Sequence, residues 1–289
     1  MNETLILTKD QIKLITNKYQ SYSLPLTTKY MLFRAKIDDT NLIIYTTYKL
    51  HIQGGSNAIF DEICSLLNIK QKNKEREIGQ NIIGTDEVGT GDFFGGIFVC
   101  ACFVPEEKEY LLKDLKIGDS KKFTDSKILE LAPIIKNNFT YTVKFLNNES
   151  YNQISKKRNM NEIKALMHNL AIKELISKNI NYDTIIIDGF TDKNKYIEYL
   201  KDNDIEVVEN VELIQKAEDK FYAVGAASII ARYHFIKHIE NLSIETGYEI
   251  LKGAGANVDE LLNKIINDGN KDLLVKIAKM NFKNYTKLY

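Results

Sequence analysis

Two adjacent acids, Asp86 and Glu87, lie in the segment GTDEVGTGDFFGG, where an apolar run meets a glycine-rich turn. Neighbouring residues on a regular strand point to opposite faces, so both acids can serve one site only where the strand ends or bulges. Gly89 and Gly91 allow such a bend and would let backbone amides approach a ligand closely, because glycine lacks a Cβ atom. A polar strand end followed by a hairpin turn explains the same residues equally well.

Further acids occur in two other segments. Asp188 ends the apolar run TIIID, and open α/β sheets bind their ligands at the carboxyl ends of strands. A solvated strand cap is the alternative for Asp188. Glu218 and Asp219 precede a helix rich in small residues, where favourable interaction with the helix dipole explains them without any site. Together, two to four carboxylates from separate segments suit Mg²⁺ or Mn²⁺ rather than zinc.

Other chemical motifs are weaker. His234 and His238 are one helical turn apart, but the residues between them, FIK, lack the glutamate of a zinc protease helix, which favours packed or solvated histidines. The glycines of KGAGA (residues 252 to 256) resemble a nucleotide-binding loop only poorly. The basic run from Lys156 to Arg158 is either a solvated face or a phosphate contact.

The three cysteines, Cys64, Cys100 and Cys102, are an odd number, and the last two lie inside an apolar run. We therefore expect structural thiols rather than a disulfide or a zinc site.

The elements that must position these acids fall into two parts. In the first, Thr8 and Gln11 form a capping-box pattern at the start of a helix. Residues 29–37 and 41–53 are β-branched and aromatic, which predicts two antiparallel strands joined by a tight turn. Helical spacing from Ile59 to Leu67 completes a unit of helix, strand, strand, helix.

The second part alternates strands with helices, which is typical of an α/β layer domain. We predict strands at residues 81–86, 95–104, 141–147 and 184–188, the last of them central and buried on both faces, and helices at residues 160–178, 223–239, 257–266 and 271–279. The helix at 160–178 should bury one face, made of Ile163, Leu166, Met167, Leu170 and Leu175. The charged run KQKNKERE separates the two parts, so we predict domains at 1–70 and 79–289 with a linker at 71–78.

Composition limits the class of protein without choosing a function. With 289 residues and a hydrophobic fraction of 44%, the chain can bury a proper core. The sequence has no apolar run of the ~18 residues that would span a bilayer and no secretory start, so we expect a cytoplasmic protein. The net charge is zero, but residues 1–80 carry 11 Lys and Arg against 8 Asp and Glu, so the excess positive charge lies in the N-terminal part.

Taken together, these motifs resemble ribonuclease HIII, a branch of the type 2 ribonucleases H. The segment GTDEVGTGDFFG resembles the opening strand motif of the family, with Thr90 where ribonuclease HII usually has arginine. IGDSKKFTDSK, NMNEIKALMHNLAI, AVGAASIIARY, KGAGANVDELL and AKMNFKN resemble further family segments, and the part ending in KLHIQGG is similar to its N-terminal substrate-binding domain. The implied fold is a ribonuclease H-like mixed sheet flanked by helices, with a small N-terminal α/β domain like the TATA-box-binding protein.

The resemblance assigns roles to individual residues. It implies an endonuclease that cuts the RNA strand of RNA/DNA hybrids, with Asp86, Glu87, Asp188 and Glu218 as catalytic acids and ligands of two Mg²⁺ or Mn²⁺ ions. Many members have aspartate at the fourth place, so Asp219 is the alternative to Glu218.

The resemblance also implies substrate contacts. It places Gly89, Thr90 and Gly91 near the ribose 2′-hydroxyls, and Ser120 and Lys121 near the substrate, with Lys121 at a phosphate. The N-terminal sheet would contact the hybrid through its polar face, for which Lys36, Lys49 and Gln53 are candidates.

Two rival functions remain open. One is a ribonuclease HII-like enzyme that cuts at single embedded ribonucleotides, against which Thr90 and the extra N-terminal unit argue. The other is a hybrid-binding protein without catalysis, whose acids merely cap strands. We expect a monomer with no obligate protein partner and no membrane association, acting in DNA replication and repair.

Overall fold

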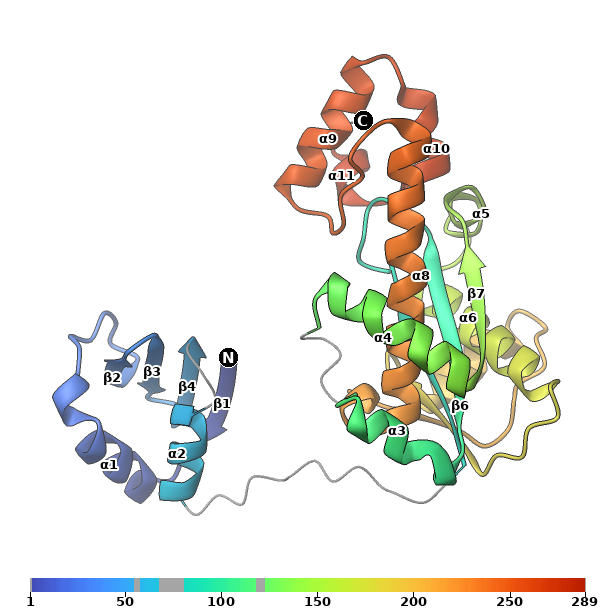
Figure 1. The fold of residues 1–289 in the computed structure, drawn as a ribbon. Coiled ribbons are helices and arrows are strands. Elements are labelled where there is room, and N and C mark those ends of the chain that lie inside the picture. Colours follow the sequence, from blue (N-terminus) through green and yellow to red (C-terminus); the bar gives the residue numbers. More distant parts are fainter. Residues whose placement is uncertain (1, 55–57, 68–80, 118–122, 289) are drawn as a thin grey trace. The chain divides into compact units, whose positions relative to one another are not determined.

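The computed structural model describes residues 2–54, 58–67, 81–117 and 123–288 and divides the chain into two compact units, Met1–Asn73 and Lys74–Tyr289 (Figure 1). The predicted linker at 71–78 and the predicted substrate contacts Ser120 and Lys121 lie outside the described residues.

In its described residues, the N-terminal unit is a four-stranded antiparallel sheet with two α-helices. Its core contains the inward residues of the strands together with Ile15 and Ile63 from the helices, all without exposed surface or nearly so. The predicted capping box is confirmed, because Thr8 and Gln11 exchange hydrogen bonds at the helix start. In chain order the elements are β1 (Asn2–Ile6), α1 (Lys9–Lys18), the 3-10 turn η1 (Gln20–Tyr22), β2 (Met31–Ile37), β3 (Thr40–Tyr45), β4 (Lys49–Gly54) and α2 (Ala58–Leu66).

The predicted order of helix, strand, strand, helix is wrong in two respects. Residues 41–53 form two strands, β3 and β4, because the chain reverses just before β4 at Tyr48, whose φ is 63°. β1 was not predicted, because its extended conformation depends on pairing with β4, a partner distant in sequence. The sheet order is β1-β4-β3-β2.

The second unit is built on a five-stranded mixed sheet in the order β7-β6-β5-β8-β9. β5, β8 and β9 are mutually parallel, whereas β6 is antiparallel to both β5 and β7. This is the predicted mixed sheet, and the strands are β5 (Ile82–Val88), β6 (Ile97–Val104), β7 (Thr140–Leu146), β8 (Thr184–Asp188) and β9 (Val211–Ile214). β9 is short and was not predicted.

Helices flank this sheet (Figure 1). They are α3 (Glu109–Asp114), α4 (Asp125–Asn138), α5 (Asn148–Ile154), α6 (Met160–Ile176), α7 (Lys193–Lys201), α8 (Tyr222–Thr246), α9 (Ala256–Asn267), α10 (Leu274–Ile277) and α11 (Lys283–Thr286), with 3-10 turns η2 (Glu106–Lys108), η4 (Ala217–Asp219) and η5 (Lys271–Leu273). The predicted helix at 271–279 is shorter, because Ala278 is extended and bridges Phe94. α3, α4, α5, α7 and α11 were not predicted.

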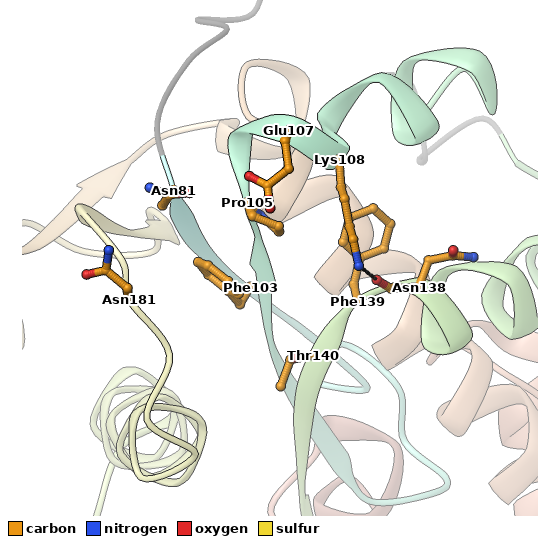
Figure 2. Close-up of a pocket in the computed structure, with 9 residues that line it drawn as sticks. All are labelled: Asn81, Phe103, Pro105, Glu107, Lys108, Asn138, Phe139, Thr140 and Asn181. Atoms are coloured by element: carbon orange, nitrogen blue, oxygen red, sulfur yellow. Dashed lines mark hydrogen bonds between the residues drawn. The ribbon is translucent and has the colours of Figure 1, made fainter.

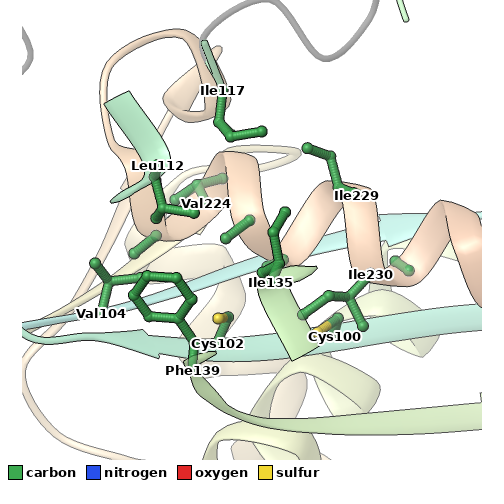
Figure 3. Packing of buried hydrophobic residues seen from close by; sticks show 14 of the residues in the cluster. Cys100, Cys102, Val104, Leu112, Ile117, Ile135, Phe139, Val224, Ile229 and Ile230 are labelled. Carbon is green, nitrogen blue, oxygen red and sulfur yellow. The ribbon is translucent and has the colours of Figure 1, made fainter. Parts of the chain in front are cut away.

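The two faces of the sheet carry separate cores. Figure 3 shows α8 packed on one face, where Val224 and Ile230 meet Cys100 and Cys102 of β6. α6 covers the other face against β6 and β7, where Ile163 belongs to the same core as strand residues such as Val99 and Ala101. The prediction that β8 is buried on both faces is confirmed. All three cysteines are buried and none of them forms a disulfide, as predicted for structural thiols.

The predicted buried face of α6 is only partly correct. Ile163, Met167 and Leu175 are buried, but Leu166 is half-buried and Leu170 is 46% exposed. The helix instead buries three polar residues, Lys164, His168 and Asn169, whose partners lie inside the domain. Those polar contacts rotate the buried face away from Leu170.

β5 lies at the middle of this unit, and Gly84 brings it against the helix. A Cβ atom on Gly84 would lie 2.2 Å from the backbone carbon of Ala223 and the backbone nitrogen of Val224. Only glycine therefore lets α8 approach this strand closely enough to hold its next residues against the sheet.

We predict that Gly84→Ala lowers the free energy of unfolding by about 1–3 kcal/mol, because the added methyl group must push backbone away from backbone. Chemical denaturation at one pH measures this. Gly91→Ala is the control, since a Cβ atom there meets nothing within 4 Å. Equal unfolding energies for the two variants would contradict the close-approach argument.

Candidate active site

The parallel pairing of β5 and β8 brings two predicted acids together. Thr85 lies opposite Ile187, so the next residues, Asp86 and Asp188, lie side by side near the carboxyl ends of two neighbouring strands. Glu218 reaches this edge from η4, which follows the adjacent strand β9. Three segments far apart in the sequence therefore place carboxylates around one point, as expected for open α/β sheets.

Asp86 points to the α8 face of the sheet. Its carboxylate accepts hydrogen bonds from the Ser228 hydroxyl of α8 and, at 2.7 Å, from the backbone N–H of Glu87. Burial and the nearby charges of Glu87 and Asp188 raise the pKa of Asp86 well above its ordinary value, although the two hydrogen bonds act in the opposite direction. Protonation of Asp86 is therefore favoured unless a cation lies nearby.

Asp188 is crowded by another acid. Its Oδ1 accepts a hydrogen bond from the Ala217 backbone N–H at 2.8 Å, and the buried carboxyl group of Glu218 lies close enough to interact with it electrostatically. Burial, followed by the charge of Glu218, raises the pKa of Asp188 to about 6. Glu218 is 1% exposed, whereas its neighbour Asp219 is half-buried. The contact with Asp188 thus involves Glu218.

Glu87 points to the opposite face of the sheet, because β5 remains a regular strand as far as Val88. There its carboxylate forms an ion pair with Lys164 and accepts a hydrogen bond from His168 Nε2 at 2.9 Å, both from α6. Burial acts to raise the pKa of Glu87, but His168 and Lys164 together bring it below its ordinary value. The bend expected beside the two acids comes only at Gly89, whose φ is 91°.

The four side chains fit hard divalent cations by their chemistry. All of their donors are carboxylate oxygens, and burial together with mutual repulsion raises the pKa values of Asp86 and Asp188, which a bound cation would reverse. Within the described ranges, no three His, Cys, Asp or Glu side chains are close enough to bind one metal ion together. If all four acids are ligands, their side chains must therefore change conformation when ions bind.

The predicted substrate-reading residues form a turn directly after β5 that is exposed at Gly91. Gly89 is buried, and a Cβ atom there would lie 2.3 Å from the Gly96 carbonyl oxygen, whereas Gly91 is open to solvent and Thr90 is half-exposed. The backbone of this turn is therefore accessible at Gly91, as contact with a ribose hydroxyl requires.

Contacts from the C-terminal segments hold the chain after this turn. The ammonium group of Lys279, which has no exposed surface, donates to the carbonyl oxygens of Asp92 and Gly95. Burial lowers the pKa of Lys279 to about 7. The Asp92 carboxylate accepts from the Gly253 N–H at 2.6 Å, so the predicted loop KGAGA packs against this segment.

Sequence reasoning missed several residues around the acids. Lys164 and His168, four residues apart on α6, and Ser228 and Arg232, four apart on α8, were inside recognised motifs but were not selected. The Arg232 guanidinium donates to the Phe123 carbonyl at 2.9 Å and interacts electrostatically with Asp86. Polar residues repeated at i and i+4 on otherwise apolar helices were the available signal.

The N-terminal candidates lie on the sheet surface opposite the hydrophobic core of their unit. Lys36, Lys49 and Gln53 are exposed, and the register places Lys36 and Gln53 on either side of Asn41. Arg34, Tyr45 and His51 belong to the same face, where the rings of Tyr45 and His51 lie 5.0 Å apart.

The other motifs have structural explanations. His234 and His238 pack among aromatic rings, with the ring centroids of Phe98 and His238 5.6 Å apart.

A surface pocket of about 360 Å³ is lined by Asn81, Lys108 and Thr140 among others (Figure 2). It lies at the start of β5, the end of the sheet away from the acids, and its lysine already donates to the Asn138 carbonyl. No helix in the described part of the chain is long and apolar enough to cross a membrane.

Comparisons with known proteins agree over nearly the whole chain. The family model described as Ribonuclease HII matches residues 83–285, and that described as Domain of unknown function (DUF3378) matches residues 2–76. The chain is 37% identical to Ribonuclease HIII of Streptococcus gordonii over 98% of this chain and 96% of that protein. It is 42% identical to Ribonuclease HIII of Phytoplasma mali over 89% and 87%. The crystal structure of Bst-RNase HIII in complex with Mn²⁺ matches with a TM-score of 0.72 and 31% identity, covering 99% and 97%.

The crowding of Asp188 predicts a pH-dependent stability. Because its folded pKa of about 6 is above the ordinary 3.8, the folded chain binds more protons between these values, and stability falls as pH rises through this window. With EDTA present, Asp188→Asn should therefore raise the melting temperature more at pH 7 than at pH 4.5. Thermal unfolding across this range measures the difference. Glu260→Gln, at an exposed position of α9, is the control for the loss of one negative charge. A gain independent of pH would contradict the assignment.

Proposed function

The chain belongs to the ribonuclease HIII family of type 2 ribonucleases H, and we propose that Asp86, Glu87, Asp188 and Glu218 form its catalytic site. The family and fold predicted from the sequence are thereby confirmed. The protein is an endonuclease that hydrolyses the RNA strand of RNA/DNA hybrids.

One observation carries the proposal for the site: carboxylates from three separate segments interact at the carboxyl ends of the parallel strands β5 and β8. Such crowding raises the energy of the fold, so it calls for a function that uses the charge. Asp86, Glu87, Asp188 and Glu218 would hold divalent ions there, and such ions would activate the attacking water and stabilise the leaving 3′ oxygen, giving 5′-phosphate and 3′-hydroxyl ends. A relative of solved structure was crystallised with Mn²⁺, and we propose Mg²⁺ or Mn²⁺ for this chain.

The residues of the chain hold this site in shape. Ser228 and the Glu87 backbone N–H orient Asp86, which interacts with both Glu87 and Asp188 and would hold bound ions together with them. The Ala217 N–H orients Asp188. Of the two candidates for the fourth acid, we propose Glu218 because it contacts Asp188 and is buried.

Specificity for RNA is proposed to come from the turn at Gly89, Thr90 and Gly91. RNA differs from DNA by its 2′-hydroxyl groups, and an accessible backbone beside the acids can contact them closely. The proposed phosphate contact at Lys121 and substrate contact at Ser120 remain predictions.

The N-terminal unit, proposed as residues 1–70 joined by a linker at 71–78 to the catalytic domain, is assigned to substrate binding. The sheet surface defined by Lys36, Lys49 and Gln53, to which Arg34 and His51 also belong, offers positive charge and hydrogen-bond donors to a nucleic-acid backbone. We propose that the chain acts as a monomer in the cytoplasm on hybrids formed during DNA replication and repair.

Two alternatives are separated by one experiment. Cleavage of a labelled RNA/DNA hybrid and of a DNA duplex with a single ribonucleotide is compared with Mg²⁺, Mn²⁺ or EDTA. Cutting within the RNA strand of the hybrid, abolished by EDTA, supports the proposal. Preference for the single ribonucleotide would instead indicate a ribonuclease HII-like specificity, and binding without cutting would indicate a hybrid-binding protein.

We predict that Asp86→Asn lowers kcat for hybrid cleavage by about a thousandfold or more, because ion-assisted stabilisation contributes several kcal/mol to the transition state. Steady-state cleavage of the hybrid measures this, and a binding assay in EDTA should show retained affinity for the hybrid. Undiminished cleavage would refute the site.

The paired control for this variant compares the two candidates for the fourth acid. Glu218→Gln should lower kcat strongly, whereas Asp219→Asn should have little effect, because the contact with Asp188 involves Glu218. The reverse order would move the fourth acid to Asp219.

We predict that Lys36→Ala with Lys49→Ala weakens hybrid binding and lowers its salt dependence by about 1–2 ion equivalents, because each phosphate contact releases bound counterions. The value of kcat should not change. Fluorescence anisotropy at several salt concentrations measures this. Lys9→Ala with Lys13→Ala on exposed positions of α1 is the matched control, and equal losses in both pairs would show that only net charge matters.

A further inference from the structure

On the α6 side of the sheet, next to the site, lie two basic side chains that have no role in the proposed mechanism. Lys164 and His168 are 8% and 0% exposed, and both contact the Glu87 carboxylate. A lysine and a histidine buried on a core helix are costly unless their partners require them. Their shared partner is one of the four proposed ion ligands.

His168 forms a fixed bridge between strand and acid. Its Nδ1 lies 2.7 Å from Thr85 Oγ1 and its Nε2 lies 2.9 Å from Glu87 Oε2, so both ring nitrogens are occupied. When Nε2–H donates to the carboxylate, Nδ1 of the neutral ring accepts from the threonine hydroxyl. The ring of Phe190 stacks on the imidazole at 5.4 Å between centroids, which limits its rotation. Glu87 Oε2 is therefore held at a defined position.

Lys164 acts on the other oxygen. Its ammonium group pairs with Glu87 Oε1 and also lies 4.2 Å above the centre of the Phe190 ring. The aromatic face gives the ammonium group a second favourable contact, which persists when the carboxylate turns toward another cation. A divalent ion that binds Glu87 through Oε1 must compete with this internal positive charge.

We propose that Lys164 and His168 are positioning residues that set the divalent-ion affinity of the site through Glu87, in opposite directions. Lys164 weakens ion binding because it occupies Oε1 and repels a second cation. His168 strengthens ion binding because it holds the carboxylate in place through Oε2, as outer hydrogen bonds to metal ligands do. This inference rests on the proposed role of Glu87 as an ion ligand.

The test is calorimetric titration of Mn²⁺ into the full-length chain at constant pH. Lys164→Met, which removes the charge at similar length, should bind Mn²⁺ roughly threefold more tightly or better. Lys164→Arg, which keeps the charge, should resemble the unmodified protein. Unchanged or weaker binding by Lys164→Met would overturn the role of Lys164.

The histidine is tested by a matched pair. Asparagine approximates the Nδ1 position and keeps only the Thr85 contact, whereas glutamine approximates Nε2 and keeps only the Glu87 contact. His168→Asn should weaken Mn²⁺ binding about tenfold, and His168→Gln should weaken it less. If the His168→Asn and His168→Gln variants bound Mn²⁺ with equal affinity, the role of His168 would be overturned. Should either fail to fold, as unfolding in EDTA would reveal, Thr85→Val removes the far anchor of the ring and should also weaken binding.

A further variant separates this inference from the proposed site. Glu87→Gln should weaken Mn²⁺ binding, and Lys164→Met added to it should no longer increase affinity. Unchanged binding by Glu87→Gln alone would show that Glu87 is not a ligand, which would refute the site itself. The Mn²⁺ concentration for half-maximal hybrid cleavage should shift in the same direction as the measured dissociation constant in each variant, falling where Mn²⁺ binds more tightly.

Discussion

Repulsion among buried carboxylates is the constraint on which the rest of this structure depends. Asp86, Asp188 and Glu218 interact at one edge of the sheet, and the fold must hold them there against their mutual charge. It does so with a parallel strand pair, two oriented backbone amides and a helix packed directly on Gly84. The stability lost at the site is compensated by the two apolar cores on either side of the sheet.

The glycine turn after β5 is subject to a different constraint, because it must be accessible and yet fixed. Glycine at positions 89 and 91 keeps side chains out of the way, while Lys279 and Gly253 hold the following residues through hydrogen bonds. Lys279 donates hydrogen bonds to the backbone carbonyls of Asp92 and Gly95, in the segment between β5 and β6. The loops that join the C-terminal helices thus have a role at the site although none of their acids contributes to it.

Much of the fold follows from local pattern. The capping box at Thr8, the apolar strand ending at Asp188 and the long helix after Glu218 were all recognisable, because each depends on residues close in sequence. The pattern failed for β1 and β9, whose strand conformation depends on pairing with distant segments. It also failed for Leu170, because α6 turns its polar residues inward.

For the site, the sequence by itself determined which acids were available and that a glycine turn follows two of them. Only the tertiary structure decided that Asp86 faces α8 whereas Glu87 faces Lys164 and His168, since strand residues alternate between faces whose coverings come from elsewhere in the chain. The contact between Asp188 and Glu218 likewise arises from the parallel order of β8 and β9. Charge interactions act through space, so residue types can be read from the sequence but their partners cannot.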